Sequence, residues 1–398
     1  MQPPLIVHIV YRFAIGGLEN GVVNLINRMP RESWRHAVVS LTDIDAAFAS
    51  RICRDNVRCV ALHKGPGHAV RLYPRILALL REIRPAIVHT RNLAALEATI
   101  PAWMARVPVR VHGEHGRDVG DLDGTRVRYQ RVRRLFRPLV TKYVAVSPDL
   151  ERYLRERIGV PAARIEQIYN GVDTARFHPP AGGRAPLTGC PFQGNGYWLV
   201  GTVGRMEPVK DQTNLARAFV AALRAHSDAR SRLRLVLVGD GKLRTEVEAI
   251  LDDAGARDLA WFAGERADVV PLLQGLDCFV LPSLAEGVSN TILEAMACAL
   301  PVVATRAGAN TELVDEEITG RTVAAGDSDA LARAIGAYFA APDLARDHGR
   351  AGRRRVERRF SLERMVEDYD RVYTGLLRAR TSEPSTVARA PAPPRARG

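Results

Sequence analysis

Two carboxylates with seven residues between them flank the start of a predicted helix, in the segment EGVSNTILE from Glu286 to Glu294. The apolar run before it predicts a buried strand, and Ser289 and Asn290 are polar caps typical of a helix start. A phosphate would bind there, because the first amides of a helix lack internal partners and the helix dipole is positive at that end. Ionised acids accept hydrogen bonds from vicinal hydroxyls, so Glu286 could bind a sugar and Glu294 a ribose. On these nine residues alone, a loop acid and a solvated helix glutamate are the simpler interpretation.

The segment GTVGRMEPVK, from Gly201 to Lys210, places two cations after the first apolar run of the second half of the chain. Arg205 and Lys210 would lie at the carboxyl end of a strand, where they suit a diphosphate, since arginine binds phosphate as a fork and lysine as a point charge. Ordinary surface charges are the alternative. The expected position opposite the helix start near Ser289 favours the functional interpretation.

Two glycine motifs are weaker signals. Gly16 and Gly17 open an apolar-periodic helix, where glycine lets a backbone approach a phosphate or a sugar, although any tight turn also favours glycine. The run at 239–241 nearly matches a dinucleotide-binding fingerprint, but Arg244 occupies the position of the third small residue and would obstruct helix packing. The sequence therefore disfavours an NAD site.

His112 and His115 lie at the end of an apolar run, and either could deliver an imidazole into a cleft. Their spacing differs from the helical His-Glu-x-x-His of zinc proteases, so a metal site is not expected there. Two acidic pairs could hold a divalent ion, but such pairs are common by chance: Asp43 with Asp45, and Asp121 with Asp123. The five cysteines are scattered, which argues against a disulfide framework and a zinc site.

Short apolar runs alternate with helical patterns through both halves of the chain, which is typical of βαβ units with a parallel sheet. The expected fold is α/β with two doubly wound Rossmann-like domains, because 398 residues exceed what one core usually supports. Turn-forming residues mark a linker, and a final helical pattern predicts a helix that bridges back to the first domain. The expected divisions are a first domain at 1–178, a linker at 179–197, a second domain at 198–360, a crossover helix at 361–380 and a disordered tail at 381–398.

Composition argues against an integral membrane protein, since 25% of the residues are charged and no apolar run is long enough to span a bilayer. The N-terminal segment resembles a first strand more than a signal peptide, so cytoplasmic residence is expected. The net charge of +13 predicts an acidic partner, and no nucleic-acid module is recognisable. Residues 126–142 alternate arginines with apolar residues, as in a basic helix that lies on an anionic membrane; an ordinary solvated helix is the equal alternative.

Taken together and in this order, these motifs resemble those of glycosyltransferase family 4, over roughly residues 5–375. The two glutamates preceded by Gly-Arg and lysine are the specific part of the match, and the turns are supportive only. The resemblance rests on Gly16-Gly17-Leu18-Glu19, His115-Gly116, Ser147, Asn170-Gly171-Val172-Asp173, Gly204-Arg205, Lys210, Gly239-Asp240-Gly241 and the run from Glu286 to Ala297. It implies a GT-B fold of two facing domains, a nucleotide-sugar donor in the second, an acceptor in the first, and retention of anomeric configuration without a metal.

The resemblance also implies roles for individual residues. Arg205 and Lys210 would neutralise the donor diphosphate and help the nucleotide leave. Glu286 would contact the transferred sugar, and His115 would line the acceptor side, with His112 as the competing assignment. The implied donor contacts are Gly17, Gly204, Gly264, Arg266, Val288, Ser289, Asn290 and Glu294, the last one with the ribose.

A finer similarity is to sugar transferases associated with exopolysaccharide export and the PEP-CTERM sorting system, on the run HGEHGRD and the basic segment after it. The expected partners are a UDP- or GDP-linked sugar and a glycan or polyprenyl-linked acceptor, at the inner face of a membrane that residues 126–142 would contact. No cofactor, metal or nucleic acid is expected. Two alternatives stay open: a nucleotide-sugar epimerase of the same fold, and a non-catalytic protein that binds anionic surfaces.

Overall fold

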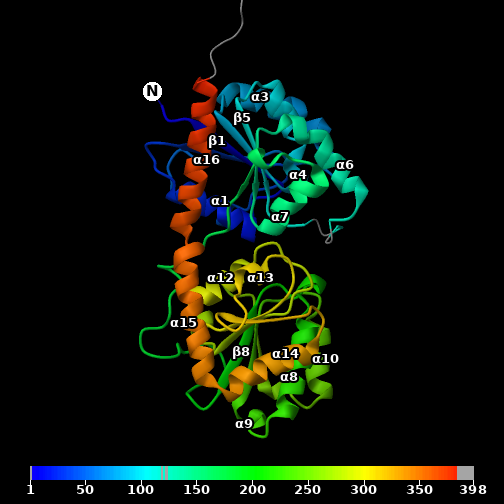
Figure 1. Cartoon of the computed structure of the whole chain (residues 1–398), viewed down its shortest axis with the longest axis vertical. Coiled ribbons are helices and arrows are strands. Elements are labelled where there is room, and N and C mark those ends of the chain that lie inside the picture. Colours follow the sequence, from blue (N-terminus) through cyan, green and yellow to red (C-terminus); the bar gives the residue numbers. More distant parts are fainter. Residues whose placement is uncertain (1, 118–119, 122–123, 383–398) are drawn as a thin grey trace, which may run out of the picture.

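The structure is a computed structural model that describes residues 2–117, 120–121 and 124–382. It contains two α/β domains, which lie one above the other in Figure 1. Most of the tail that was expected to be disordered, from residue 383 onward, lies outside the described residues. None of the described helices is both long enough and apolar enough to cross a bilayer.

The first domain is built on a seven-stranded sheet in which all neighbours are parallel, with the order β3-β2-β1-β4-β5-β6-β7. Its strands are β1 (Leu5–Val10), β2 (Arg35–Ser40), β3 (Arg58–Ala61), β4 (Ile87–Arg91), β5 (Val109–Glu114), β6 (Lys142–Ala145) and β7 (Ile165–Gln167). The central strands β1 and β4 are buried along their whole length, because helices cover both faces of the sheet.

The second domain has a six-stranded parallel sheet with the order β10-β9-β8-β11-β12-β13. Its strands are β8 (Trp198–Val203), β9 (Leu233–Val238), β10 (Ala260–Gly264), β11 (Cys278–Leu281), β12 (Val302–Thr305) and β13 (Gly320–Val323). Two doubly wound parallel sheets confirm the predicted fold class. The sequence did not predict β7 and β13, which are short edge strands with polar residues in them.

Helices pack on both faces of each sheet. In the first domain they are α1 (Gly17–Arg28), α2 (Ala46–Ala49), α3 (Tyr73–Ile83), α4 (Asn92–Leu96), α5 (Thr99–Met104), α6 (Val127–Phe136) and α7 (Pro148–Arg152). The second domain has α8 (Gln212–Ala225), α9 (Ala229–Arg232), α10 (Arg244–Asp253), α11 (Val269–Gln274), α12 (Asn290–Ala297), α13 (Asn310–Leu313) and α14 (Ser328–Ala340), followed by α15 (Pro342–Arg359) and α16 (Leu362–Ser382). Single turns of other helix types are η1 (Ala69–Leu72), η2 (Arg137–Leu139), η3 (Tyr153–Ile158), η4 (Ala162–Arg164), η5 (Pro208–Lys210) and η6 (Arg257–Leu259).

The strand order of each sheet reverses beside its first strand, at β1–β4 in the first domain and at β8–β11 in the second. Ligands of doubly wound folds bind outside the carboxyl ends of the strands at such a switch point. In Figure 1, α1 and α7 lie at the lower edge of the first domain, and α12 and α13 at the facing edge of the second. The fold therefore brings both switch points to the side where the domains meet.

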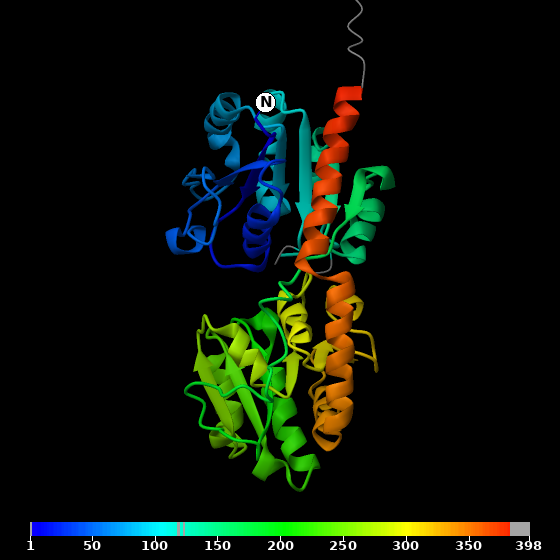
Figure 2. The ribbon, with the colours of Figure 1, turned by 90° about the vertical axis from the view of Figure 1, so that its left-hand side faces the viewer.

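The chain crosses between the domains beside the break between α15 and α16, two helices that run along one side of the molecule (Figure 2). Val172 is joined to this break by two backbone hydrogen bonds: its amide donates to Phe360 at 2.9 Å, and its carbonyl accepts from Leu362 at 3.0 Å. A Cβ on Gly171 would lie only 2.7 Å from the Cα of Leu362, so the approach needs glycine. As predicted, α16 bridges back, since its apolar face packs against the core of the first domain.

Two expected segments look different in the structure. The basic helix expected over 126–142 is wrong in its extent, because α6 ends at Phe136 and Lys142 lies on β6. It is also wrong in its exposure, because Arg133 points inward and is only 3% exposed. The segment 179–197 forms turns and isolated bridges, and it packs on the second domain through three buried residues, Leu187, Cys190 and Phe192.

Candidate active site

The loop with Glu286 connects β11 to α12, and Ser289 caps that helix. The Oγ of Ser289 accepts a hydrogen bond from the amide of Ile292 at 3.4 Å. Val288 and Ser289 are buried, which fixes the backbone at the helix start. Because the first amides of a helix have no partner within it, those around Asn290 are available to an anionic ligand.

The Glu286 loop is held by the segment that follows β12. The amide of Ala309 donates to the carbonyl oxygen of Gly287 at 3.0 Å. Gly308 has a φ of +54°, and a Cβ there would collide with the carbonyl oxygen of Glu286. Only glycine permits both this conformation and this approach.

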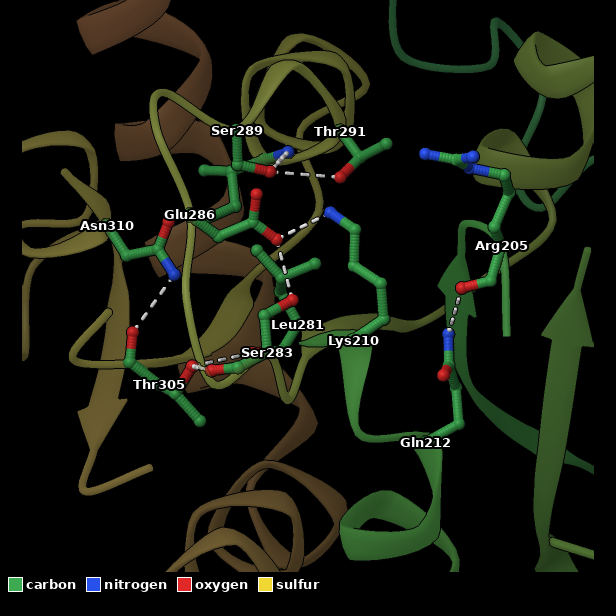
Figure 3. Close-up of polar contacts among 11 residues, drawn as sticks. Arg205, Lys210, Gln212, Leu281, Ser283, Glu286, Ser289, Thr291, Thr305 and Asn310 are labelled. Atoms are coloured by element: carbon green, nitrogen blue, oxygen red, sulfur yellow. Dashed lines mark hydrogen bonds and ion pairs between the residues drawn. The ribbon is translucent and has the colours of Figure 1, made fainter. Parts of the chain in front are cut away.

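A salt bridge between Lys210 and Glu286 lies at the centre of the site (Figure 3). The Nζ of Lys210 is 2.6 Å from Oε1 of Glu286, and the Oγ of Ser283 donates to the same oxygen at 2.6 Å. The Glu286 side chain is 9% exposed and that of Lys210 27% exposed. Sequence reasoning did not single out Ser283, although a polar residue directly after a buried strand was an available signal.

Arg205 supplies the second cation of the site. Its carbonyl oxygen accepts a hydrogen bond from Nε2 of Gln212 at 3.0 Å, and its guanidinium group has no partner among the residues described. Figure 3 shows this group directed toward Thr291 and the ammonium group of Lys210. Two cations near a helix start are suited to a diphosphate.

The glycine run at 239–241 packs against the backbone of the loop after β8. The amide of Met206 donates to the carbonyl oxygen of Asp240 at 2.8 Å. A Cβ on Gly239 would collide with the carbonyl oxygen of Gly204. The glycines therefore allow the close backbone approach that places Gly204 at this edge of the sheet.

Gly264 and Arg266 lie at the end of β10, further along the same sheet edge. Gly264 has a φ of +67°, and its carbonyl oxygen accepts from the amide of Gly239 at 2.8 Å. The guanidinium group of Arg266 donates to both carboxylate oxygens of Asp268, at 2.7 and 2.6 Å, and to the carbonyl oxygen of Thr188 at 3.1 Å. Its donors are thus engaged within the second domain.

Glu294 lies one turn into α12 and is half-buried. Burial raises the pKa of its carboxyl group to about 7, and the positive charges of Arg176 and Arg51 offset this only in part. The group therefore changes its charge near neutral pH.

Asn290 connects the two domains at the start of α12. Its Nδ2 donates to the carbonyl oxygen of Gly17 at 3.3 Å, and its Oδ1 accepts from Nδ2 of Asn170 at 3.0 Å. A Cβ on Gly17 would lie 3.1 Å from the Nδ2 of Asn290. The sequence predicted only a turn at Asn170, and nothing in that motif indicates its contact with the second domain.

The structure distinguishes the two histidines. His112 lies within β5, has no exposed surface, and its Nδ1 is 2.9 Å from Oγ1 of Thr90. His115 follows the strand, and its amide donates to Oδ1 of Asn92 at 2.8 Å. The carbonyl oxygen of His115 would be 2.5 Å from a Cβ on Gly287, so it meets the second domain. His115, not His112, lies where the domains meet.

Arg91, at the end of β4, is a buried cation that sequence reasoning missed. It is 3% exposed, and its Nη1 lies 3.0 Å from Nδ1 of His8. Burial, followed by the positive charge of Arg91, lowers the pKa of His115 to about 3, so that imidazole is neutral at physiological pH. The available signal was a basic residue that closes the apolar run AIVHTR.

Comparisons with known proteins show which family the chain belongs to. Residues 15–176 match the model of Glycosyltransferase Family 4, and residues 198–340 match that of glycosyl transferases group 1. The putative glycosyltransferase EpsD of Bacillus subtilis (strain 168) is 30% identical over 335 residues, which cover 78% of this chain and 84% of that protein. The chain belongs to glycosyltransferase family 4.

The enzyme is also similar to the lipopolysaccharide core biosynthesis mannosyltransferase LpcC of Rhizobium leguminosarum bv. viciae, with 39% identity over 218 residues. That alignment covers 53% of this chain and 59% of LpcC. Among solved structures, Anabaena Alr3699/HepE in complex with UDP and glucose has a TM-score of 0.79 at 20% identity, and the match covers 94% of this chain and 100% of that one. This likeness shows that the two domains form a GT-B fold.

Proposed function

We propose that this glycosyltransferase moves a sugar from a nucleotide diphosphate sugar to a glycan or polyprenyl-linked acceptor, with retention of anomeric configuration. The observation that carries the proposal is the salt bridge between Lys210 and Glu286 beside the start of α12, with the guanidinium group of Arg205 directed toward that helix start. Cations and unpaired helix amides stabilise the charge that develops on a leaving diphosphate, which is usually the largest contribution to catalysis. The carboxylate beside them can hold hydroxyl groups of the transferred sugar.

The other site residues have their places in the same proposal. Glu294 binds the ribose, and the base lies near Gly264 and Arg266. Gly17 covers the diphosphate from the first domain. His115 lines the acceptor side, where a neutral imidazole can donate or accept a hydrogen bond. The chain's own cations supply the positive charge, so the proposal includes no metal ion.

The relatives support a product in the cell envelope. LpcC is a lipopolysaccharide core biosynthesis mannosyltransferase. HepE was solved with UDP and glucose, which supports a UDP-linked donor. A GDP-linked donor is the alternative. We therefore propose exopolysaccharide or another envelope glycan as the product, made at the inner face of a membrane.

Thermal melting with UDP, GDP, ADP and NAD in parallel tests the donor site. We expect UDP or GDP alone to raise the melting temperature, since a ligand at a hundred times its Kd stabilises the native state by about 2.7 kcal/mol. The nucleotide that does so identifies the donor. A shift with NAD alone, or with none of the four at millimolar concentration, would contradict the proposal.

The affinity for the donor should depend on pH through Glu294. Its pKa of about 7 means that the carboxylate, the better acceptor for ribose hydroxyls, forms as the pH rises. We expect affinity for the intact nucleotide sugar, whose esterified phosphates do not titrate in this range, to rise about tenfold from pH 6 to pH 8. Titration calorimetry at several pH values measures this, and the same rise in Glu294→Gln would rule the assignment out.

The contribution of Glu294 to the stability of the unliganded protein should fall as the pH rises, whereas the donor affinity should rise. The folded chain holds the Glu294 proton more tightly than the unfolded chain does, because the folded-state pKa is raised. This carboxyl group's contribution to the free energy of unfolding is complete below its ordinary value of 4.5 and is lost as the pH rises through 7.

The outer face of α6 is the proposed membrane contact. It exposes Arg128 and Arg131 together with two apolar side chains, Val127 at 53% and Leu135 at 73% exposure. We expect the enzyme to sediment with vesicles that contain anionic lipid, and the variant Arg128→Glu/Arg131→Glu to bind at least about tenfold more weakly, since each basic residue near such a surface contributes about 1 kcal/mol.

The matched control for this sedimentation test reverses two arginines of α8, Arg217 and Arg224, which makes the same change in net charge on the second domain. If the α6 variant and the wild type bound the vesicles equally, α6 would not be the membrane contact.

A further inference from the structure

Arg133 and Glu114 form a buried ion pair under α6. The Nε of Arg133 donates to Oε1 of Glu114 at 2.6 Å, and its Nη2 donates to Oε2 at 3.1 Å. Arg133 is 3% exposed and Glu114 is 1% exposed. A bidentate pair fixes direction as well as distance. Because Glu114 is the last residue of β5, the pair fastens α6 to the carboxyl end of that strand.

The pair belongs to a buried polar cluster that includes His112 and Thr90. Burial alone raises the pKa of Glu114, but the charge and the hydrogen bonds of Arg133, together with the nearby His112, hold it well below its ordinary range. The Nε2 of His112 lies 3.4 Å from Oε1 of Glu114, and its other ring nitrogen meets Thr90. Buried ion pairs are often no more stabilising than apolar residues of similar volume. We therefore expect this pair to affect the local geometry more than the stability of the fold.

The carboxyl end of β5 leads directly to the proposed acceptor side. Glu114 is linked through one peptide unit to His115, whose amide is held by Asn92 and whose carbonyl oxygen meets Gly287. A displacement of Glu114 is therefore passed to both contacts. Near the start of α6, Nε2 of Gln130 donates to the carbonyl oxygen of Gly124 at 2.8 Å.

We propose that Glu114 and Arg133 are positioning residues that set the place of His115 against the second domain. Because Arg133 lies on the inner side of α6, the same pair ties His115 to the helix whose outer face is the proposed membrane contact. An acceptor held at that face then keeps a fixed position relative to His115. The effect on turnover rests on the proposed function, whereas the effect on the His115 backbone does not.

A double variant separates positioning from stability. Arg133→Met alone leaves a buried carboxylate without its cation and can fail to fold. Glu114→Gln/Arg133→Met removes both charges at similar volume, and we expect it to melt close to the wild type. Its kcat should fall about tenfold or more, with the KM for the nucleotide sugar unchanged, since small misplacements of positioned groups cost about this much or more. A wild-type kcat in this variant would overturn the proposal.

Arg133→Lys provides a second variant, because lysine keeps the charge but cannot form two parallel hydrogen bonds. We expect its kcat to lie between those of the wild type and the double variant. A kcat equal to that of the wild type would contradict the positioning role. The matched control is Glu151→Gln/Arg155→Met, which removes a surface ion pair of 3.8 Å and should leave kcat unchanged.

Hydrogen exchange gives a readout that does not need activity. We expect the amide of His115, which Asn92 holds, to exchange at least about tenfold faster in the double variant, while amides of the second-domain core keep their protection. Unchanged exchange at His115 would overturn the proposal. If the wild type transferred no sugar and exchange still rose in the variant, the proposed function would fail and the positioning pair would stand.

Discussion

A Lys210→Ala variant is expected to stay folded and to lose about a thousandfold in kcat, because in the proposed reaction this cation stabilises the leaving diphosphate. The Nζ of Lys210 lies 2.6 Å from Glu286 at the centre of the site. The substitution also leaves a carboxylate that is 9% exposed with Ser283 as its remaining partner. This should lower the free energy of unfolding by about 1 to 3 kcal/mol. Acceptor-dependent nucleotide release and a melting curve measure the two effects.

The chain offers a matched control in Lys242, which also follows a strand of the second sheet. Its side chain is 79% exposed and lies 3.5 Å from Glu207, so Lys242→Ala should retain the wild-type kcat. Lys210→Arg keeps the charge and should recover part of the loss. A folded Lys210→Ala enzyme with a wild-type kcat would contradict the donor-site assignment.

The proposed donor side of the site was predictable because its residues are close in sequence or lie at equivalent strand ends. Glu286, Ser289 and Glu294 share one loop and one helix, so a capping pattern and a spacing are enough to bring them together. Lys210 is remote in sequence, but it follows β8, which pairs with β11 in a parallel sheet. The carboxyl ends of parallel neighbours meet at one edge, which is a general property of the fold.

Which residues of a helix point into the interior could not be derived in this way. Arg131, Arg133 and Arg134 are chemically identical on one short helix, and Arg133 pairs in the interior with Glu114, 19 positions before it. An amphipathic pattern contains no information about such a distant partner.

The assignment of the two histidines had the same limit. His112 and His115 differ in exposure because β5 ends at Glu114, which puts one inside the sheet and the other beyond it. Sequence patterns locate strand ends only to within a few residues, and here a few residues decide which histidine meets the second domain.

A Glu286→Gln variant is expected to lose two to three orders of magnitude in kcat, about the cost of removing one charge-stabilising group from an active site. Glutamine has nearly the same size, and its side-chain oxygen can still accept from Ser283 and Lys210, so the fold should be retained. What is lost is the negative charge that, in the proposed complex, holds the hydroxyl groups of the transferred sugar. Steady-state kinetics with the intact nucleotide sugar measure the effect.

The binding of nucleotide without sugar distinguishes this variant from Lys210→Ala. Glu286 contacts the sugar in the proposed complex, so Glu286→Gln should bind UDP or GDP as tightly as the wild type, whereas Lys210→Ala should weaken both ligands. The control Glu246→Gln changes an exposed carboxylate of α10 and should match the wild type in both assays. If Glu286→Gln instead turned over at the wild-type rate, the carboxylate would have no part in holding the sugar, and its salt bridge with Lys210 would not be needed for turnover.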